Sequence, residues 1–310
     1  MSSTAGRLSP SPSVLAIFGP TASGKSAVAE AIAERIPAEL VSADSMQVYR
    51  GLPILTNQDT VARLVGIWPL DHQASVGEYQ PLAHAAIDDI LASGRTPIVV
   101  GGTGLYLRAA LSELRIPPAP SPGARRRWDA LYDESAEDAH AQLAELDPAA
   151  AAAVHPNDRR RVVRALELAE AGVSLRPERD GLWADDTRHS TLVFGLDLPA
   201  EELGPRIERR ARGMFAQGVR AEIEAALAGP VSATARYALG LADIAENADD
   251  EQATEALVAR TKRYAAYQRK WMRRIPGLVS LPANRPPGAI ADAILEVARA
   301  RQRLPAGRAG

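Results

Sequence analysis

The feature that most constrains the fold is an eight-residue stretch near the amino terminus, Gly19-Pro20-Thr21-Ala22-Ser23-Gly24-Lys25-Ser26. It matches the phosphate-loop pattern GxxxxGK[S/T] at every fixed position, and it lies between an apolar run, 14–18, and a stretch of helical periodicity, 26–36. In that context backbone N–H groups can curl around phosphate oxygens, and the helix amino terminus adds partial positive charge. We expect Lys25 to supply a mobile charge and the Ser26 hydroxyl to ligate Mg²⁺. A Gly-rich turn that only begins a helix is the alternative. The pattern indicates a di- or triphosphate ligand without saying which.

The order of the other elements predicts an α/β fold with a parallel sheet. Apolar runs at 39–43, 97–100 and 192–197 are typical of buried strands, and 82–91 is typical of a helix. After the Pro-rich segment 117–122 the chain looks helical to about residue 171 and then polar and irregular. These features predict a P-loop NTPase-like parallel-sheet core interrupted by an all-helical insertion. The predicted boundaries are a disordered leader at 1–13, a core of 14–116 plus 190–304, an insertion at 117–189 and a loose tail at 305–310.

Composition narrows the class of protein further. The 310 residues carry 36 basic and 38 acidic side chains, a net charge of −2, so affinity for nucleic acid has to come from local patches. The absence of cysteine excludes disulfides, thiolate zinc sites, iron–sulfur clusters and cysteine nucleophiles. No apolar run approaches the ~18 residues of a membrane span, and the leader has no hydrophobic segment typical of export. We therefore expect a cytoplasmic protein that does not associate with membranes.

Polar residues follow the predicted strands where a ligand is expected. Ligands of open α/β sheets lie at the carboxyl ends of the strands, so the loops 19–26, 44–50 and 101–106 should meet. There Asp44 can hold Mg²⁺ through water or accept a proton from a nucleophile, with a plain helix N-cap as the alternative. Thr103, within Gly-Gly-Thr-Gly, can donate to an oxyanion, although a tight strand–helix turn explains the pattern equally well.

Three stretches, GPTASGKS, SADSMQVYRGL and RTPIVVGGTGLYLRAAL, resemble tRNA dimethylallyltransferases, which prenylate adenosine-37 next to the anticodon. The resemblance continues through 155–167, through 203–222 (similar to LxxRIxxRxxxMxxxGxxxE) and through 261–271, and it covers about residues 14–282. It implies transfer of a dimethylallyl group from dimethylallyl diphosphate to N6 of adenosine-37 in tRNAs that read codons beginning with U. The partners that it implies are the tRNA anticodon loop and the diphosphate donor, with Mg²⁺ as cofactor. Since the family is mostly monomeric, a monomer is expected.

The resemblance also implies residue roles. Residues 19–26 would hold the diphosphate, with Lys25 beside the departing charge. Asp44 would bind N6 of the adenine and take its proton, and Thr103 would hydrogen-bond the oxygen of the departing diphosphate. The positions that match tRNA contacts are Asp44, Ser45, Met46, Gln47, Thr103, Arg125, Arg160, Arg161, Val162, Val163, Arg164, Arg263 and Gln268.

The chain departs from the family pattern in two places. Where a Gly-Thr-x-Lys-Pro stretch is usual, the segment 55–59 lacks both the Gly and the Lys, and Tyr237 stands where many members have Gln or Arg. A cation near the diphosphate is thus absent from its expected place, and Arg236 can substitute from the neighbouring position.

A run of basic residues points to RNA. Residues 260–274 hold seven basic and no acidic side chains, interleaved with Tyr264, Tyr267 and Trp271. RNA contact with stacking is predicted, and an amphipathic helix with buried aromatic residues is the alternative. Three other functions remain open: prenylation of free adenine nucleotides, a small-molecule kinase that uses Asp44 or Asp197 for magnesium, and non-catalytic RNA binding.

Overall fold

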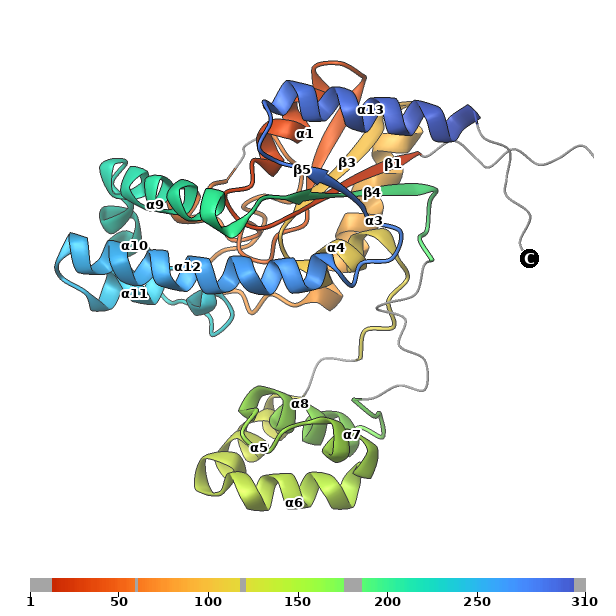
Figure 1. The fold of residues 1–310 in the computed structure, drawn as a ribbon. Helices are drawn as coiled ribbons and strands as arrows, with labels where there is room; N and C mark the ends of the chain where they lie inside the picture. The colour runs from red at the N-terminus through yellow and green to blue at the C-terminus, as the bar shows by residue number, and fades with distance from the viewer. Residues whose placement is uncertain (1–12, 59–60, 118–120, 176–185, 304–310) are drawn as a thin grey trace, which may run out of the picture. The chain divides into compact units, whose positions relative to one another are not determined.

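The computed structural model describes residues 13–58, 61–117, 121–175 and 186–303 (Figure 1). The chain divides into two compact units, one formed by 1–113 with 185–310 and the other by 114–184. We refer to them as the core and the insertion. The predicted leader lies almost wholly outside the described residues, and the predicted tail lies wholly outside them.

The core is built on one five-stranded parallel sheet with the strand order β2-β3-β1-β4-β5. The predicted α/β class is therefore confirmed. The first four strands lie where continuous apolar runs predicted them, because both faces of the sheet are covered and a strand buried on both faces is apolar throughout. The strands are β1 (Val14–Phe18), β2 (Ala38–Ser42), β3 (Thr96–Gly101), β4 (Thr191–Asp197) and β5 (Val279–Pro282).

Helices cover both faces of this sheet. In Figure 1, α1 and α13 lie over one face, and α3 and α4 lie on the other. The apolar side chains of α1 and α13 enclose Ile17 and Phe194 of the central strands, which are fully buried. The helices of the core are α1 (Lys25–Ala33), α2 (Pro53–Thr56), α3 (Val76–Ala92), α4 (Gly104–Leu111), α9 (Ala200–Ala216), α10 (Val219–Leu227), α11 (Leu241–Glu246), α12 (Asp250–Met272) and α13 (Pro287–Arg303), with a 3-10 turn at Ala235–Tyr237.

A second apolar cluster joins α9–α12 to the segment around α2. It includes Leu55, Met214, Ile223 and Leu257. Glu222 of α10 strengthens this contact, because its two carboxylate oxygens accept hydrogen bonds from the backbone N–H groups of residues 54 and 55 at 2.7 and 2.8 Å. These donors belong to the first turn of α2 and have no partner within the helix, so the carboxylate caps it.

The insertion is a helical unit with its own apolar centre. Leu143, Val162 and Leu166 are fully buried in it, and Trp128 packs against them. Asp147 and Asp158 cap the helices that follow them by accepting from Ala150 N and Arg161 N. Its helices are α5 (Pro122–Glu134), α6 (Ala136–Leu146), α7 (Pro148–Ala153) and α8 (Arg159–Glu170).

The carboxyl-terminal boundary of the insertion differs from the predicted residue 189. Residues 186–189 belong to the core, because Arg188 N donates to Leu111 O and the side chains of Arg188 and His189 both contact Asp88 of α3. A polar, irregular composition does not reveal such contacts, so the sequence placed these residues in the insertion.

Candidate functional site

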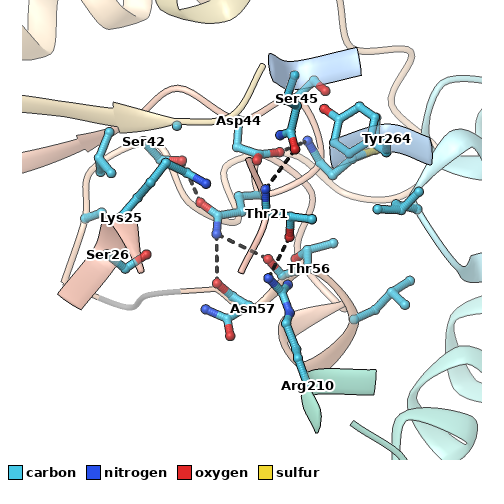
Figure 2. A pocket seen from close by; sticks show the side chains of 18 of the residues that line it. Thr21, Lys25, Ser26, Ser42, Asp44, Ser45, Thr56, Asn57, Arg210 and Tyr264 are labelled. Carbon is cyan, nitrogen blue, oxygen red and sulfur yellow. Dashed lines mark hydrogen bonds between the residues drawn. The ribbon is translucent and has the colours of Figure 1, made fainter. Parts of the chain in front are cut away.

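The three loops that were predicted to meet surround one cavity of about 200 Å³ at the carboxyl ends of β1, β2 and β3 (Figure 2). They meet because these strands are neighbours in a parallel sheet. Other parts of the core complete the wall, namely the segment 55–57 and side chains of α9 and α12. The polar residues that line the cavity are Thr21, Lys25, Ser26, Ser42, Asp44, Ser45, Gln47, Thr56, Asn57, Arg210, Tyr237, Tyr264 and Gln268.

Lys25 lies in this cavity with two charged neighbours. Its ammonium group donates to the carbonyl oxygen of Pro20 at 2.8 Å. Burial lowers the pKa of Lys25 to about 8, the Asp44 carboxylate opposes that change, and the Arg210 guanidinium adds to it. A buried ammonium group with a lowered pKa is stabilised by an anion beside it, as expected of a site that holds a diphosphate.

Asp44 follows β2 and forms a turn of its own. Its Oδ1 accepts a hydrogen bond from Met46 N at 2.9 Å, an Asx-type turn, and the next helix begins only at Pro53. The helix N-cap alternative is therefore wrong. The carboxylate is half-buried and lines the cavity opposite the phosphate loop (Figure 2).

Gln268 ties the phosphate loop to the loop after β3. Its Oε1 accepts from Thr21 N at 2.8 Å, and its Nε2 donates to Gly102 O at 2.9 Å. The residue is 2% exposed, and a Cβ at position 102 would collide with its amide. The sequence assigned Gln268 to tRNA binding; its side chain is buried and bonded to two backbone groups, and a contact with tRNA stays a prediction.

The loop that carries Thr103 is held on both sides. Its hydroxyl lies 3.3 Å from both Ser45 N and Ser45 Oγ. Trp271 packs so closely that only glycine fits at position 104. Thr103 is not among the residues that line the cavity, and its contact with a departing diphosphate stays a prediction.

Gln47 and Met46 also line the cavity. The Gln47 amide donates to the carbonyl oxygens of Thr56 and Asn57, and its Oε1 accepts from Ser42 Oγ. These bonds hold the segment around α2 against the end of β2. Ser45, Met46 and Gln47 remain predicted tRNA contacts. The amide of Gln47 already forms three hydrogen bonds within the core.

The sequence analysis missed Arg210. It extends from α9, and its Nη1 donates to Thr21 Oγ1 at 2.9 Å (Figure 2). Burial lowers the pKa of its guanidinium, while the Asp44 charge opposes this shift. The sequence signal that could have identified Arg210 is its place as the second arginine of the 203–222 motif.

Arg236 was expected to replace an absent cation near the diphosphate. It is exposed and does not line the cavity. Tyr237 does line the cavity and is 73% exposed.

Mg²⁺ can be accommodated beside the phosphate loop. Mg²⁺ keeps several waters and takes one or two protein oxygens together with phosphate oxygens. The Ser26 and Asp44 side chains line one cavity and provide such oxygens. Within the described ranges, no cluster of three or more acidic or histidine side chains offers a different metal site.

The predicted tRNA residues of the insertion fall into two groups. Arg125 and Arg164 both bind the buried carboxylate of Glu167. Val162 and Val163 are buried, so their side chains serve the packing of the insertion, and their assignment to tRNA contact stays a prediction. Arg160 and Arg161, in contrast, are exposed, and the shortest ion-pair distance of Arg161 is 3.8 Å, to Asp158.

The basic run 260–274 occupies most of the second half of α12. Arg260, Lys262 and Arg269 pair with Asp243, Glu208 and Asp197. Of the three aromatic residues, Tyr264 lines the cavity and Trp271 packs on Gly104, both half-buried, while Tyr267 is 54% exposed, and stacking on RNA stays a prediction. The cations of this run that are exposed and have no acidic partner among the described residues are Arg263, Lys270 and Arg273.

The sheet, the phosphate loop and the carboxylate across the cavity define an α/β protein with a site for a phosphorylated ligand. Among family models, that described as IPP transferase matches residues 47–275, and that described as isopentenyl transferase matches 12–67. The chain belongs to the IPP transferase family. No helix in the part of the chain that the structure describes is long and apolar enough to span a membrane.

Individual relatives agree with this placement. The tRNA dimethylallyltransferase of Salinispora arenicola is 39% identical over 298 residues, which covers 92% of this chain and 86% of the relative. That of Acidothermus cellulolyticus is 41% identical over 308 residues, with 93% and 92% covered. The tRNA isopentenylpyrophosphate transferase of Bacillus halodurans superposes with a TM-score of 0.67 at 28% identity, with 94% and 98% covered. A eukaryotic dimethylallyltransferase solved acting on tRNA has a TM-score of 0.76 at 24% identity, which supports the fold.

Proposed function

We propose that this protein is a tRNA dimethylallyltransferase that moves a dimethylallyl group from dimethylallyl diphosphate to N6 of adenosine-37 in tRNAs that read codons beginning with U. The observation that carries the proposal is that Asp44 faces a cationic phosphate loop across one small cavity. If the amine binds Asp44 and the diphosphate binds the phosphate loop, the transferred carbon lies between them. The names of the relatives support the same reaction.

On the donor side, the protein stabilises a departing anion. The allylic C–O bond breaks, and negative charge grows on the diphosphate. Lys25 and Arg210 lie where that charge develops, together with the N–H groups of the loop and the amino terminus of α1. Preorganised groups of this kind contribute roughly 3–4 kcal/mol each to the stabilisation of a transition state. Mg²⁺ held by Ser26 would neutralise part of the same charge.

On the acceptor side, Asp44 acts as a hydrogen-bond acceptor and general base. The adenine N6 lone pair is delocalised into the ring, so the amine is a weak nucleophile. A carboxylate that accepts its hydrogen bond localises the electron density and takes the proton as the N–C bond forms, an effect of ~10²–10⁴ in rate. The base has to leave its stack to enter the cavity, at a cost of a few kcal/mol in a single-stranded loop.

Exposed cations support RNA binding by this protein. Arg160 and Arg161 on α8 are exposed, and so are Arg263 and Lys270 on α12 and Arg273 directly after it. Phosphate contacts from both units would explain why a protein with a net charge of −2 binds RNA.

A labelling experiment tests the proposed function. We expect the protein, given tRNA that lacks the modification, to transfer label from dimethylallyl diphosphate to adenosine-37, and a tRNA with guanosine at that position to stay unlabelled. ATP labelled in its terminal phosphate is the second donor, and AMP is the second acceptor. Transfer of label from ATP alone would support a kinase, and prenylation of AMP in preference to tRNA would support the free-nucleotide reaction. Both results contradict the proposal.

The lowered pKa of Lys25 predicts how donor affinity depends on pH. The ammonium form binds the diphosphate, and the pKa of Lys25 without a bound anion is about 8. Protonation is nearly complete at pH 7 and is lost above pH 8, so the dissociation constant of the donor should rise about tenfold between pH 7 and pH 9. Equilibrium titration across this range measures the effect. Lys25→Arg is the control, since a guanidinium does not titrate there. An equal rise in both proteins would assign the pH dependence to another group.

A further inference from the structure

A second cavity, of about 610 Å³, lies on the outer side of the phosphate loop. The start of α1, the segment 53–58 and one face of α9 form its walls, and it shares Lys25, Ser26, Asn57 and Arg210 with the cavity that holds Asp44. Its volume falls within the roughly 300–1,000 Å³ of small-molecule sites. We call it the outer cavity.

The α9 wall of the outer cavity is strongly cationic. Arg206, Arg209 and Arg210 are spaced three and four residues apart on one helix face, and Lys25 faces them from α1. No aspartate or glutamate is among the described residues that line this cavity. It therefore gathers four positive side chains around one space.

Arg206 and Arg209 of the outer cavity form no ion pair in the described part of the chain, whereas Arg212 of α9 and Lys262 of α12 each pair with a glutamate. Arg206 donates to a backbone carbonyl, that of Ala283, and exposed Arg209 has no acidic partner in the described part of the chain. Two charged residues of α9 that do not line the outer cavity are paired: Arg212 with Glu251, and Glu208 with Lys262. The unneutralised arginines are thus those that face the cavity.

These positive charges repel one another, and an anion among them relieves the repulsion. Like charges three or four residues apart on a helix destabilise it. A cleft lined by one sign of charge concentrates counter-ions, and guanidinium groups match the oxygens of phosphates in fork-like geometry. The ligand that fits best is small and carries several negative charges.

We propose that the outer cavity is a second diphosphate site, which holds pyrophosphate after it leaves the phosphate loop. The inference rests on the proposed function, because that reaction releases pyrophosphate at Lys25 and Arg210. These two side chains line both cavities, so the anion can pass outward while it keeps contact with positive charge. Arg206 and Arg209 line the outer cavity alone, and they are the residues that separate the second site from the first.

Pyrophosphate binding to the full chain tests this proposal without turnover. Calorimetric titration with inorganic pyrophosphate at fixed Mg²⁺ should show two sites in the unaltered protein. An unreactive thiolo analogue of dimethylallyl diphosphate should occupy the phosphate loop and leave one of them. The double variant Arg206→Gln/Arg209→Gln should weaken that remaining site about tenfold or more, since each substitution removes a charge-assisted hydrogen bond to the anion. Arg212→Gln is the matched control, because Arg212 lies on α9, pairs with Glu251 and does not line the outer cavity, and this variant should bind as the unaltered protein does.

Two results would overturn the outer site. One is a single pyrophosphate site in the unaltered protein, and the other is a second site that the double variant leaves unchanged. Loss of tRNA affinity with a shallower salt dependence in the double variant, at unchanged pyrophosphate binding, would instead assign these arginines to RNA phosphates. The same preparations are also assayed for transfer from dimethylallyl diphosphate to tRNA. If no transfer occurs, the proposed function is contradicted, while the measured number of pyrophosphate sites still stands.

Discussion

Asp44→Asn is expected to reduce the single-turnover rate of dimethylallyl transfer by about 10²–10⁴ while affinity for dimethylallyl diphosphate stays within a few-fold. The amide keeps an oxygen for the Met46 N–H, so the turn after β2 should survive. It cannot take the N6 proton, and its NH₂ group would oppose the amine instead of accepting from it. Single-turnover measurements at saturating donor and tRNA separate this chemical effect from binding.

Asp197→Asn provides the matched control for that experiment. Asp197 also ends a strand of the sheet, but it lies 3.4 Å from Arg269 and does not line the Asp44 cavity. It was the other carboxylate considered for a magnesium-dependent kinase. Transfer should continue in the Asp197 variant. Full activity of Asp44→Asn, or loss confined to Asp197→Asn, would remove Asp44 from its proposed role.

The second large effect is expected at Gln268. Gln268→Ala leaves Thr21 N and Gly102 O without their partner in a buried place, at about 1–3 kcal/mol for each unsatisfied group. The phosphate loop and the loop of Thr103 then lose their common anchor, and a misplacement of about 1 Å costs about 10²-fold in rate. We therefore expect a fall of that size in the single-turnover rate, with unchanged tRNA affinity.

Arg263→Gln, from the exposed face of the same helix, is the control for Gln268. It should weaken tRNA binding and leave the rate at saturating tRNA unchanged, the reverse of the pattern for Gln268→Ala. If Gln268→Ala instead weakens tRNA binding and reacts normally at saturating tRNA, the side chain contacts RNA and the anchoring role is wrong. Thermal unfolding of both variants shows whether each remains folded at the assay temperature.

Much of the core was predictable because its elements leave local signals. Buried parallel strands produce continuous apolar runs, and the phosphate loop has a fixed spacing between a strand and a helix. Strand β5 left no such signal: it lies at the edge of the sheet, where Val279 and Leu281 are half-buried and their neighbours exposed. Alternation over four residues is too short to distinguish a strand from a loop.

The part of the candidate site formed by the loops after β1, β2 and β3 was predictable from the sequence, and the part formed by later helices was not. Residues 19–26, 44–47 and 101–104 follow strands, so their meeting follows from the order of a parallel sheet. Arg210, Tyr264 and Gln268 come from helices far along the chain, and no local pattern indicates which of their neighbours they touch. A sequence motif also identifies positions without showing which way each side chain points. For that reason Val162 and Val163, which are buried, were grouped with the exposed arginines beside them.

Some side chains of the site come from residues far along the chain, and this affects when the site can form during synthesis. The phosphate loop leaves the ribosome early, but the side chains that fix Thr21 and Gly102 belong to α9 and α12, more than a hundred residues later. A nascent chain that ends before residue 264 has the donor loop without its anchor or the aromatic wall. The site is therefore complete only after α12 has been synthesised, and a chain cut before Gln268 would keep the phosphate loop but lose the side chain that anchors it.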